Sequence, residues 1–256
     1  MLNQNFLLDK LRNSEEVCFG SWSIVYNPLL VEIITSTEID FLIFDSEHGP
    51  WNFNQIIESS MICEKNQVSP IMRVPDISRG NISKAFDSGI HGVQVPNIGK
   101  KEEAEMVVDF SKFTPVGSRG FSPFTRSSNY SYQFSEALIN KANDNTAVII
   151  HIENKEGLDN VDEILDQKHI DIVFLGLFDL SLILNQPGHI DHPDVKEKFT
   201  FIAEKVISSG KILGSIVTNK DQIEFLTENK VRYLTYSADC QIISDEYNKI
   251  FNNLKG

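Results

Sequence analysis

Three side chains capable of acid–base chemistry, Asp45, Glu47 and His48, follow directly on the apolar run Phe-Leu-Ile-Phe at positions 41–44. A short apolar run that ends in turn formers is typical of a strand buried on both faces. Ionisable groups are costly inside a core but are expected where a strand opens into a site. A carboxylate beside an imidazole fixes its tautomer and raises its basicity, so Asp45 and His48 are predicted to be catalytic. A lone histidine here could instead donate to a backbone carbonyl.

Two more carboxylates end apolar runs later in the chain. Glu153 follows the run at 147–152, and Asp179 follows the run at 170–178. Carboxylates at the same end of adjacent parallel strands can share one cation, and oxygen ligands with waters suit Mg²⁺ or Mn²⁺. Glu153 and Asp179 are therefore predicted metal ligands, with Co²⁺ also possible. The alternatives are that Glu153 pairs with Lys155 and that Asp179 caps the helix that follows it.

Further residues are predicted to line a substrate pocket. Arg73 ends an apolar run that is predicted to be buried, and a buried arginine requires an anion as its partner. The planar guanidinium group suits a substrate carboxylate. A salt bridge to Glu47 or Asp45 is the alternative. His151 shares a strand face with Glu153, and Trp22 lies beside the expected mouth. Glu47 is predicted to contact the waters of the cation.

Strand-like and helix-like segments alternate along the whole chain, and these elements must position the residues above. The predicted strands are residues 17–22, 41–44, 70–74, 92–96, 147–153, 170–176, 211–217 and 233–237. Helical periodicity is clear at 82–86 and 199–207. Eight βα units with doubly buried strands predict one α/β domain over residues 1–256, a (β/α)8 TIM barrel, with an open doubly wound sheet as the alternative.

Two segments break this rhythm. Residues 114–126 form a long loop rich in Gly, Pro and Ser, which its arginines and aromatic residues predict to be ordered near a site, followed by a helix near 134–142. Residues 241–254 place Ile243, Tyr247, Ile250 and Leu254 on one helical face. This terminal helix could cover its own barrel or reach a neighbouring subunit.

Composition narrows the function classes. The net charge of −13 argues against nucleic-acid binding, and no apolar run approaches the ~20 residues needed to span a bilayer. The N-terminus has no basic segment of the kind that begins a secretion signal. The three cysteines, widely spaced and without a metal-ligand pattern, suggest reduced thiols and a cytoplasmic protein.

At this point the motifs resemble those of the HpcH/HpaI aldolase family, the metal-dependent (class II) pyruvate aldolases related to the citrate lyase β chain. The matching motifs are Asp-Ser-Glu-His-Gly-Pro at 45–50, Arg-Val-Pro at 73–75, residues 86–97, Gly-Ser-Arg-Gly at 117–120, Ile-Glu at 152–153 and Gly-Leu-Phe-Asp-Leu-Ser at 176–181. They run in family order from about residue 17 to 240.

The resemblance implies a phosphoenolpyruvate/pyruvate-type (β/α)8 barrel in which Glu153 and Asp179 hold the ion, and His48, with Asp45 behind it, acts as the base. It also implies that Arg73 lies near the pyruvyl group and that Asp87 reaches the active site of a neighbour. The expected assembly is a homo-oligomer, a hexamer built as a trimer of dimers, with the C-terminal helix exchanged between subunits.

The sequence departs from the family pattern in two places. Leu177 and Phe178 precede Asp179 where relatives often have Gly-Pro-x-Asp, so Phe178 is expected to reshape the acceptor pocket. His151 stands where relatives often have Gln. Because of these two changes, the family pattern does not predict which aldehyde this chain accepts.

The expected reaction joins or splits pyruvate and an aldehyde through a 4-hydroxy-2-oxo acid. No Schiff-base lysine is needed, and Lys155 is the only candidate for one. Two alternatives remain. One is an acyl-CoA lyase of the citrate lyase or malyl-CoA type, which the charge of −13 disfavours because CoA needs basic residues. The other is a barrel that binds a 2-oxo acid without turnover.

Overall fold

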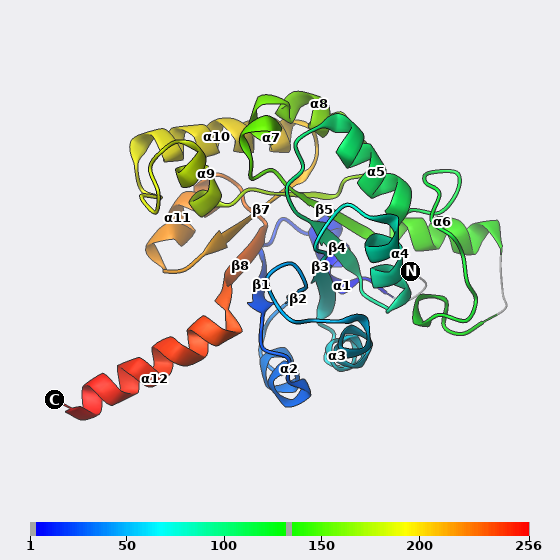
Figure 1. Ribbon diagram of the computed structural model, residues 1–256, viewed down its shortest axis with the longest axis horizontal. Coiled ribbons are helices and arrows are strands. Elements are labelled where there is room, and N and C mark those ends of the chain that lie inside the picture. Colours follow the sequence, from blue (N-terminus) through cyan, green and yellow to red (C-terminus); the bar gives the residue numbers. More distant parts are fainter. Residues whose placement is uncertain (1–3, 132–134, 256) are drawn as a thin grey trace.

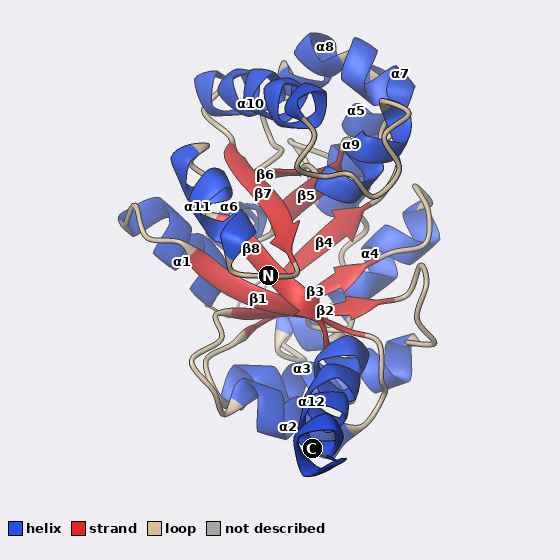
Figure 2. Ribbon diagram, turned by 90° about the vertical axis from the view of Figure 1, so that its left-hand side faces the viewer, coloured by secondary structure: helices blue, strands red, loops and turns tan. Residues whose placement is uncertain are grey.

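The computed structural model describes residues 4–131 and 135–255. Its eight strands form one closed parallel barrel in sequence order, and β1 pairs with β8 to complete the ring. Figure 2 shows the strands at the centre with helices arranged around them. The strands are β1 (Cys18–Ser23), β2 (Phe41–Asp45), β3 (Ser69–Arg73), β4 (Gly92–Val95), β5 (Ala147–His151), β6 (Ile172–Phe174), β7 (Ile212–Val217) and β8 (Tyr233–Ala238). The predicted barrel is confirmed, and the open sheet is excluded.

The helices are α1 (Phe6–Asn13), α2 (Pro28–Thr35), α3 (Phe53–Lys65), α4 (Arg79–Asp87), α5 (Lys101–Ser111), α6 (Glu136–Asp144), α7 (Lys155–Asp159), α8 (Val161–Leu165), α9 (Leu177–Ile183), α10 (Pro193–Ser208), α11 (Asp221–Glu228) and α12 (Asp239–Lys255). Most of them connect successive strands and bury apolar residues against the outer face of the barrel, whereas α12 projects from it (Figure 1). The predicted helix near 134–142 is α6, although Phe134 lies outside the described residues.

Side chains rather than solvent fill the barrel interior. The rings of Phe41 and Tyr233 stack with centroids 4.1 Å apart. Gly20 makes this possible, because a Cβ at that position would lie 2.1 Å from the ring of Phe41. Leu7 and Leu11 of α1 belong to the same buried cluster, at the end of the barrel opposite the strand C-termini. A filled, rigid barrel is the scaffold that holds the strand ends in place.

Register brings the predicted site residues of different strands together. Asp45 at the end of β2 pairs with Arg73 at the end of β3, and His151 of β5 pairs with Phe174 of β6. Because all strands run parallel, their C-terminal ends meet at one rim, where active sites of this fold lie.

Candidate active site

A cavity of about 390 Å³ opens at this rim. Most of the residues predicted for the site line it, from five of the eight strand–loop units. They are Trp22, Asp45, His48, Arg73, His151, Glu153, Phe178 and Asp179. The remaining lining residues are Ile24, Phe174, Ile216, Thr218, Ser237, Ala238 and Gln241.

A buried ion pair joins the ends of β2 and β3. Nε and Nη2 of Arg73 donate to Oδ1 and Oδ2 of Asp45 at 2.8 and 2.6 Å, and Nη1 lies 3.0 Å from Oε2 of Glu47. The guanidinium carbon also lies 4.3 Å from the centre of the Trp22 ring. The alternative interpretation of Arg73, a salt bridge to Asp45 or Glu47, is therefore confirmed for both partners. Its remaining N–H groups are available to the cavity.

Asp45 holds its own loop as well as Arg73. Its Oδ1 accepts from the backbone amides of Glu47 and His48, at 3.0 and 3.3 Å, and its side chain is completely buried. The predicted contact between Asp45 and the imidazole of His48 is not seen in the described residues. The ring of His48 is instead largely exposed at the mouth, where Nε2 lies 4.0 Å from Oε2 of Glu47. Asp45 positions His48 through the backbone because Arg73 occupies the carboxylate.

Glu153, just beyond β5, is fixed by donors on both oxygens. The backbone amide of Asn97 donates to Oε1 at 2.9 Å, and Nδ1 of His151 lies 2.9 Å from Oε2. Asn97 has a left-handed backbone conformation, with φ of 59°. Neither donor is Lys155, so this alternative partner does not account for the position of Glu153.

A chain of buried polar groups stands behind Glu153. The hydroxyl of Tyr233 donates to Oε1 of Gln94 at 3.0 Å, and the amide nitrogen of Gln94 donates to Nε2 of His151. Because an amide nitrogen can only donate, Nε2 of His151 accepts and Nδ1 carries the proton that faces Glu153. Phe174 stacks on the His151 ring at 4.6 Å. The tautomer and the plane of His151 are thus both fixed.

Asp179 occupies the first turn of α9, above a glycine. A Cβ at Gly176 would lie 2.5 Å from Oδ2 of Asp179, so only glycine leaves room for the carboxylate in this position. Gly176 occupies the N-cap position of α9, so Asp179 lies inside the helix and is not its N-cap residue. Asp179 lines the same cavity as Glu153.

The acidic groups of the site influence one another. Burial, and next the negative charge of Glu153, raise the pKa of Asp179. The pKa of Glu47 is raised by burial, which the charge of Arg73 partly offsets and that of Glu153 reinforces. For Glu153, burial alone would raise the pKa, but the interactions with His151, including its hydrogen bond, and the hydrogen bond from the amide of Asn97 outweigh it, and the pKa is lowered. The carboxylates outnumber the one arginine that pairs with them, and the resulting net negative charge suits a cation.

The donor set fits a hard divalent ion. Glu153 and Asp179 present carboxylate oxygens, which Mg²⁺ and Mn²⁺ prefer, and Gly176 clears the space around one of them. Within residues 4–131 and 135–255, no group of three or more His, Cys, Asp or Glu could hold a metal ion. An ion held by this pair would take its other ligands from waters and from the substrate.

Asp87 lies away from this cavity in its own chain. Its Oδ1 accepts from Nη2 of Arg119 at 2.6 Å, at the end of α4, and Arg119 is buried against Phe86 and Phe113. Arg126 of the same loop pairs with Glu64 at the end of α3. The expectation that residues 114–126 lie near the site is wrong within one chain, because the loop follows α5 toward the start of β5, opposite the rim.

Three residues of the site were missed in the sequence. Gln94, Tyr233 and Asn97 orient His151 and Glu153. Gln94 and Asn97 lie within the matching motif at 86–97, but the sequence assigned no site role to any of the three residues. The available signal was a glutamine inside the apolar run Gly-Val-Gln-Val at 92–95, since a buried amide requires partners.

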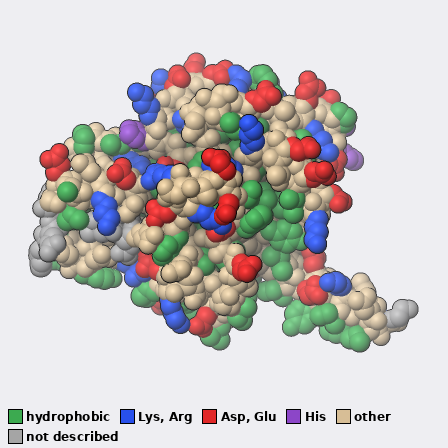
Figure 3. All heavy atoms as spheres, turned by 180° about the vertical axis from the view of Figure 1, so that it is seen from behind, with side chains coloured by type: hydrophobic (Ala, Val, Ile, Leu, Met, Phe, Trp, Pro, Cys, Tyr) green, Lys and Arg blue, Asp and Glu red, His purple; other side chains and the backbone are tan. Residues whose placement is uncertain are grey.

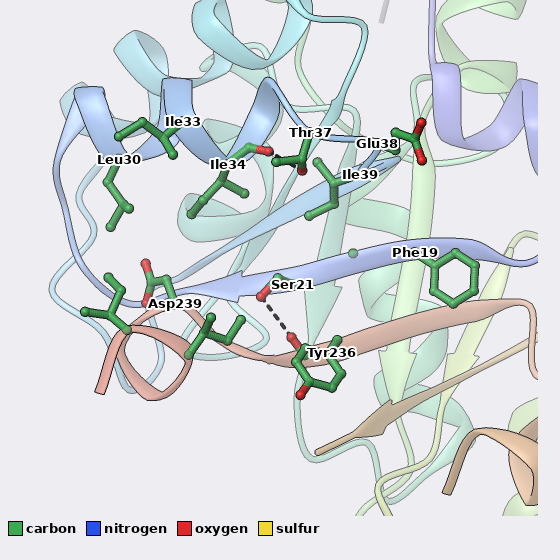
Figure 4. Close-up of a pocket in the computed structure, with 13 residues that line it drawn as sticks. Phe19, Ser21, Leu30, Ile33, Ile34, Thr37, Glu38, Ile39, Tyr236 and Asp239 are labelled. Atoms are coloured by element: carbon green, nitrogen blue, oxygen red, sulfur yellow. Dashed lines mark hydrogen bonds between the residues drawn. The ribbon is translucent and has the colours of Figure 1, made fainter. Parts of the chain in front are cut away.

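A larger groove of about 480 Å³ lies on the outside of the barrel, between α2, β1, β8 and the start of α12 (Figure 4). Its lining is mostly apolar, including Phe19, Leu30, Ile33, Ile34 and Tyr236. Its acidic residues are Glu38 and Asp239, and Asp239 already accepts hydrogen bonds from Ser23 and from the backbone amides of Ile24 and Val25. We therefore assign the chemistry to the smaller cavity at the rim.

A closed (β/α)8 barrel with an acidic, histidine-bearing cavity at its C-terminal rim defines an enzyme scaffold of a familiar class. The model of the HpcH/HpaI aldolase/citrate lyase family matches residues 19–237. The chain belongs to the HpcH/HpaI aldolase/citrate lyase family, as its motifs predicted. The predicted enzyme class, a carbon–carbon lyase of the aldolase type, is confirmed with it.

Individual relatives agree with this assignment. The chain is similar to 5-keto-4-deoxy-D-glucarate aldolase of Escherichia coli, with 26% identity over 242 residues and 94% of each chain covered. It superimposes on an HpcH/HpaI aldolase from Desulfitobacterium hafniense with a TM-score of 0.92, at 24% identity, covering 98% of this chain and 96% of the other. For the citrate synthase SbnG the TM-score is 0.88 at 25% identity, with 98% of each chain covered.

Proposed function

We propose that this protein is a metal-dependent aldolase that splits 4-hydroxy-2-oxo acids into pyruvate and an aldehyde, or joins the two. The observation that supports this most is the convergence of Glu153 and Asp179 on one cavity beside Arg73 and His48. The similarity to 5-keto-4-deoxy-D-glucarate aldolase supports a 2-oxo acid as the substrate class.

Glu153 and Asp179 would hold a divalent ion, Mg²⁺ or Mn²⁺, with Co²⁺ as a substitute. When bound, the ion supplies a Lewis acid for the negative charge that develops on the keto oxygen. Arg73 directs its remaining N–H groups at the pyruvyl end and offsets charge there. Its contact with Trp22 holds the guanidinium plane in place.

His48 serves as the base in the cleavage direction. It takes the proton of the C4 hydroxyl, and C4 becomes the carbonyl carbon of the aldehyde as the C3–C4 bond breaks. The electron pair of that bond passes to the pyruvyl fragment and forms the enolate of pyruvate. The enolate then gains a proton at C3. The exposed position of His48 at the mouth lets the ring reach a substrate that enters from solvent. The residues lining the cavity include no lysine, so a Schiff base has no candidate among them.

Two alternatives fit less well. An acyl-CoA lyase needs cations at the mouth. Among the described residues that line the cavity, Arg73 is the only Lys or Arg, and it already binds two carboxylates. A barrel that only binds a 2-oxo acid has no need of a base at the mouth. The similarity to a citrate synthase keeps carbon–carbon bond formation open as the physiological direction.

The proposal is tested with pyruvate alone. Exchange of the pyruvate methyl protons in D2O, followed by NMR, requires only enolate formation. It should depend on added Mg²⁺ or Mn²⁺, stop with EDTA, and be lost in Glu153→Gln and Asp179→Asn. Exchange that persists unchanged in EDTA would exclude the metal assignment.

We also propose a homo-oligomer in which α12 packs on a second copy. Figure 1 shows α12 extending away from the barrel, and Figure 3 shows hydrophobic side chains along it and on the body near its base. Its half-exposed or exposed apolar residues are Ile242, Ile243, Tyr247, Ile250, Phe251 and Leu254. The apolar groove beside α2 offers a matching surface. A trimer of such dimers is the expected hexamer.

The environment is proposed to be the cytoplasm. Cys18, Cys63 and Cys240 are all free thiols. In the described part of the chain, no helix is long and apolar enough to cross a membrane. Small 2-oxo acids and aldehydes are the proposed partners, and nucleic acid is not.

A further inference from the structure

The cavity has two chemically different walls. One carries the acidic rim and Arg73. The other is apolar, and its side chains come from β6, α9, β7, β8 and the loop after β1. These apolar residues are Ile24, Phe174, Phe178, Ile216 and Ala238. A substrate whose pyruvyl end lies at the acidic rim must place its remaining atoms along the second wall.

Phe178 is the residue of the apolar wall that adjoins a proposed metal ligand in the sequence. It directly precedes Asp179 in the first turn of α9, and 38% of its surface stays exposed. The outer edge of this wall carries only neutral polar groups, Thr218, Ser237 and Gln241. An incoming group therefore meets an aromatic ring, aliphatic side chains and uncharged hydrogen-bond partners.

The charges of the site disfavour a second anion. Asp45, Glu153 and Asp179 line the cavity and Glu47 adjoins it, whereas Arg73 is the only Lys or Arg in the lining. A divalent ion would still leave this group of side chains net negative, and bound pyruvate adds a further negative charge. Among the described residues that one chain contributes to the cavity wall, no cation is free for a carboxylate on the acceptor.

We infer that the acceptor is a short uncharged aldehyde, with an apolar chain packed against Phe178 and Ile216, rather than an aldehyde that carries a carboxylate. This inference rests on the proposed aldolase function and names its acceptor class. It separates this chain from enzymes that act on sugar diacids.

The test compares two acceptors of equal chain length in the aldol addition to pyruvate. Butanal is uncharged, and succinic semialdehyde ends in a carboxylate. The assembled wild-type enzyme with Mn²⁺ should show a kcat/KM for butanal higher by about tenfold or more, as expected for one like-charge interaction at roughly 10 Å in a partly screened site. Equal values, or a preference for succinic semialdehyde, would overturn the inference.

Charge-introducing variants isolate the cause. Phe178→Arg, and independently Thr218→Arg, should lower KM for succinic semialdehyde relative to butanal by about tenfold, since each adds a cation to the second wall. Leu182→Arg is the matched control, because Leu182 lies on the same helix, is 61% exposed and does not line the cavity. A shift equal in Leu182→Arg would mean that net charge alone controls the preference, and the inference would fall.

Proton exchange of pyruvate distinguishes failure of the acceptor inference from failure of the aldolase assignment. Exchange that is present, together with a preference for the charged acceptor, defeats the inference and leaves the aldolase assignment standing. Absence of exchange under any metal defeats the aldolase assignment, and the acceptor inference with it.

Discussion

Nδ1 of His151 lies 2.9 Å from Oε2 of Glu153, and the other ring nitrogen accepts from Gln94. The histidine thus connects a carboxylate at the rim with a glutamine and a tyrosine in the barrel interior. Groups that hydrogen-bond to metal ligands orient them and tune their affinity. The position of Glu153 therefore depends on Gln94 and Tyr233, which do not line the cavity.

Gln94→Leu should weaken metal binding without removing a proposed ligand. It leaves the Tyr233 hydroxyl and Nε2 of His151 without their partner, so the tautomer of His151 is no longer fixed. We expect Mn²⁺ affinity, measured by EPR titration, to fall about 10- to 100-fold. In ¹⁵N spectra of the wild type, the proton of His151 should reside on Nδ1. The partly exposed Gln167→Leu serves as the control, and unchanged affinity in Gln94→Leu would exclude the relay.

Asp179→Asn should stabilise the metal-free protein at neutral pH. Burial and Glu153 raise the folded-state pKa of Asp179 above 3.8, so the ionised carboxylate opposes folding. The penalty is complete above the raised pKa and disappears as the pH falls through it toward 3.8. The difference in unfolding free energy between variant and wild type, measured in urea with EDTA, should shrink over that interval.

Added Mn²⁺ should reverse this order of stability. The ion binds the folded wild type and stabilises it by mass action, whereas Asp179→Asn has lost one of the two proposed ligands. A variant stabilised by Mn²⁺ as much as the wild type would remove Asp179 from the metal site.

His48→Ala should separate two reactions of the same site. Aldol cleavage requires a base for the C4 hydroxyl, and general bases typically contribute 10²- to 10⁴-fold. Decarboxylation of oxaloacetate needs no such proton transfer, so the variant should retain much of the wild-type rate. Loss of both activities to the same degree would place the base elsewhere. His169→Ala, in a turn outside the cavity, is the matched control.

Arg73→Ala should destabilise the fold as well as the site. It leaves the fully buried Asp45 carboxylate without its charge partner, a change that typically costs about 3–5 kcal/mol. Arg73→Lys keeps the charge but loses the two parallel hydrogen bonds. Its free energy of unfolding should therefore lie between those of the wild type and Arg73→Ala. Urea unfolding measures both variants. Arg79→Ala, which removes exposed contacts with Asp109 and Ser118, should change stability by about 1 kcal/mol or less.

Ile250→Asp should weaken the proposed assembly, whereas Lys249→Asp should not. Ile250 belongs to the apolar face of α12, and Lys249 pairs with Glu246 on the same helix. Light scattering after gel filtration should show a smaller species only for Ile250→Asp. A wild type that is monomeric at all concentrations would refute the exchange of α12.

The sequence was sufficient for the barrel because most of its strands are short, largely apolar runs between turn formers. The predicted bounds of β2, for example, extend from Phe41 to Phe44, and the structure adds only Asp45. Charged residues at the ends of these apolar runs indicated the rim, because ionisable groups are expected where a buried strand opens into a site. The loop at 114–126 was misplaced because composition shows that a loop is ordered but not which end of the barrel it covers.

Side-chain pairing within the site could not be read from the sequence. Asp45 is closer in sequence to His48, but the register of β2 and β3 sets it against Arg73, which binds it from two nitrogens. The relay through Gln94 and Tyr233 joins residues 139 positions apart, and no local pattern encodes such a contact. Long-range register, rather than residue type, decided these partners.

The projecting position of α12 has a thermodynamic consequence. If its apolar face is covered only by another polypeptide, then unfolding also dissociates the complex, and the order of the reaction exceeds one. The melting temperature then rises with protein concentration, and dilution alone favours the unfolded chain.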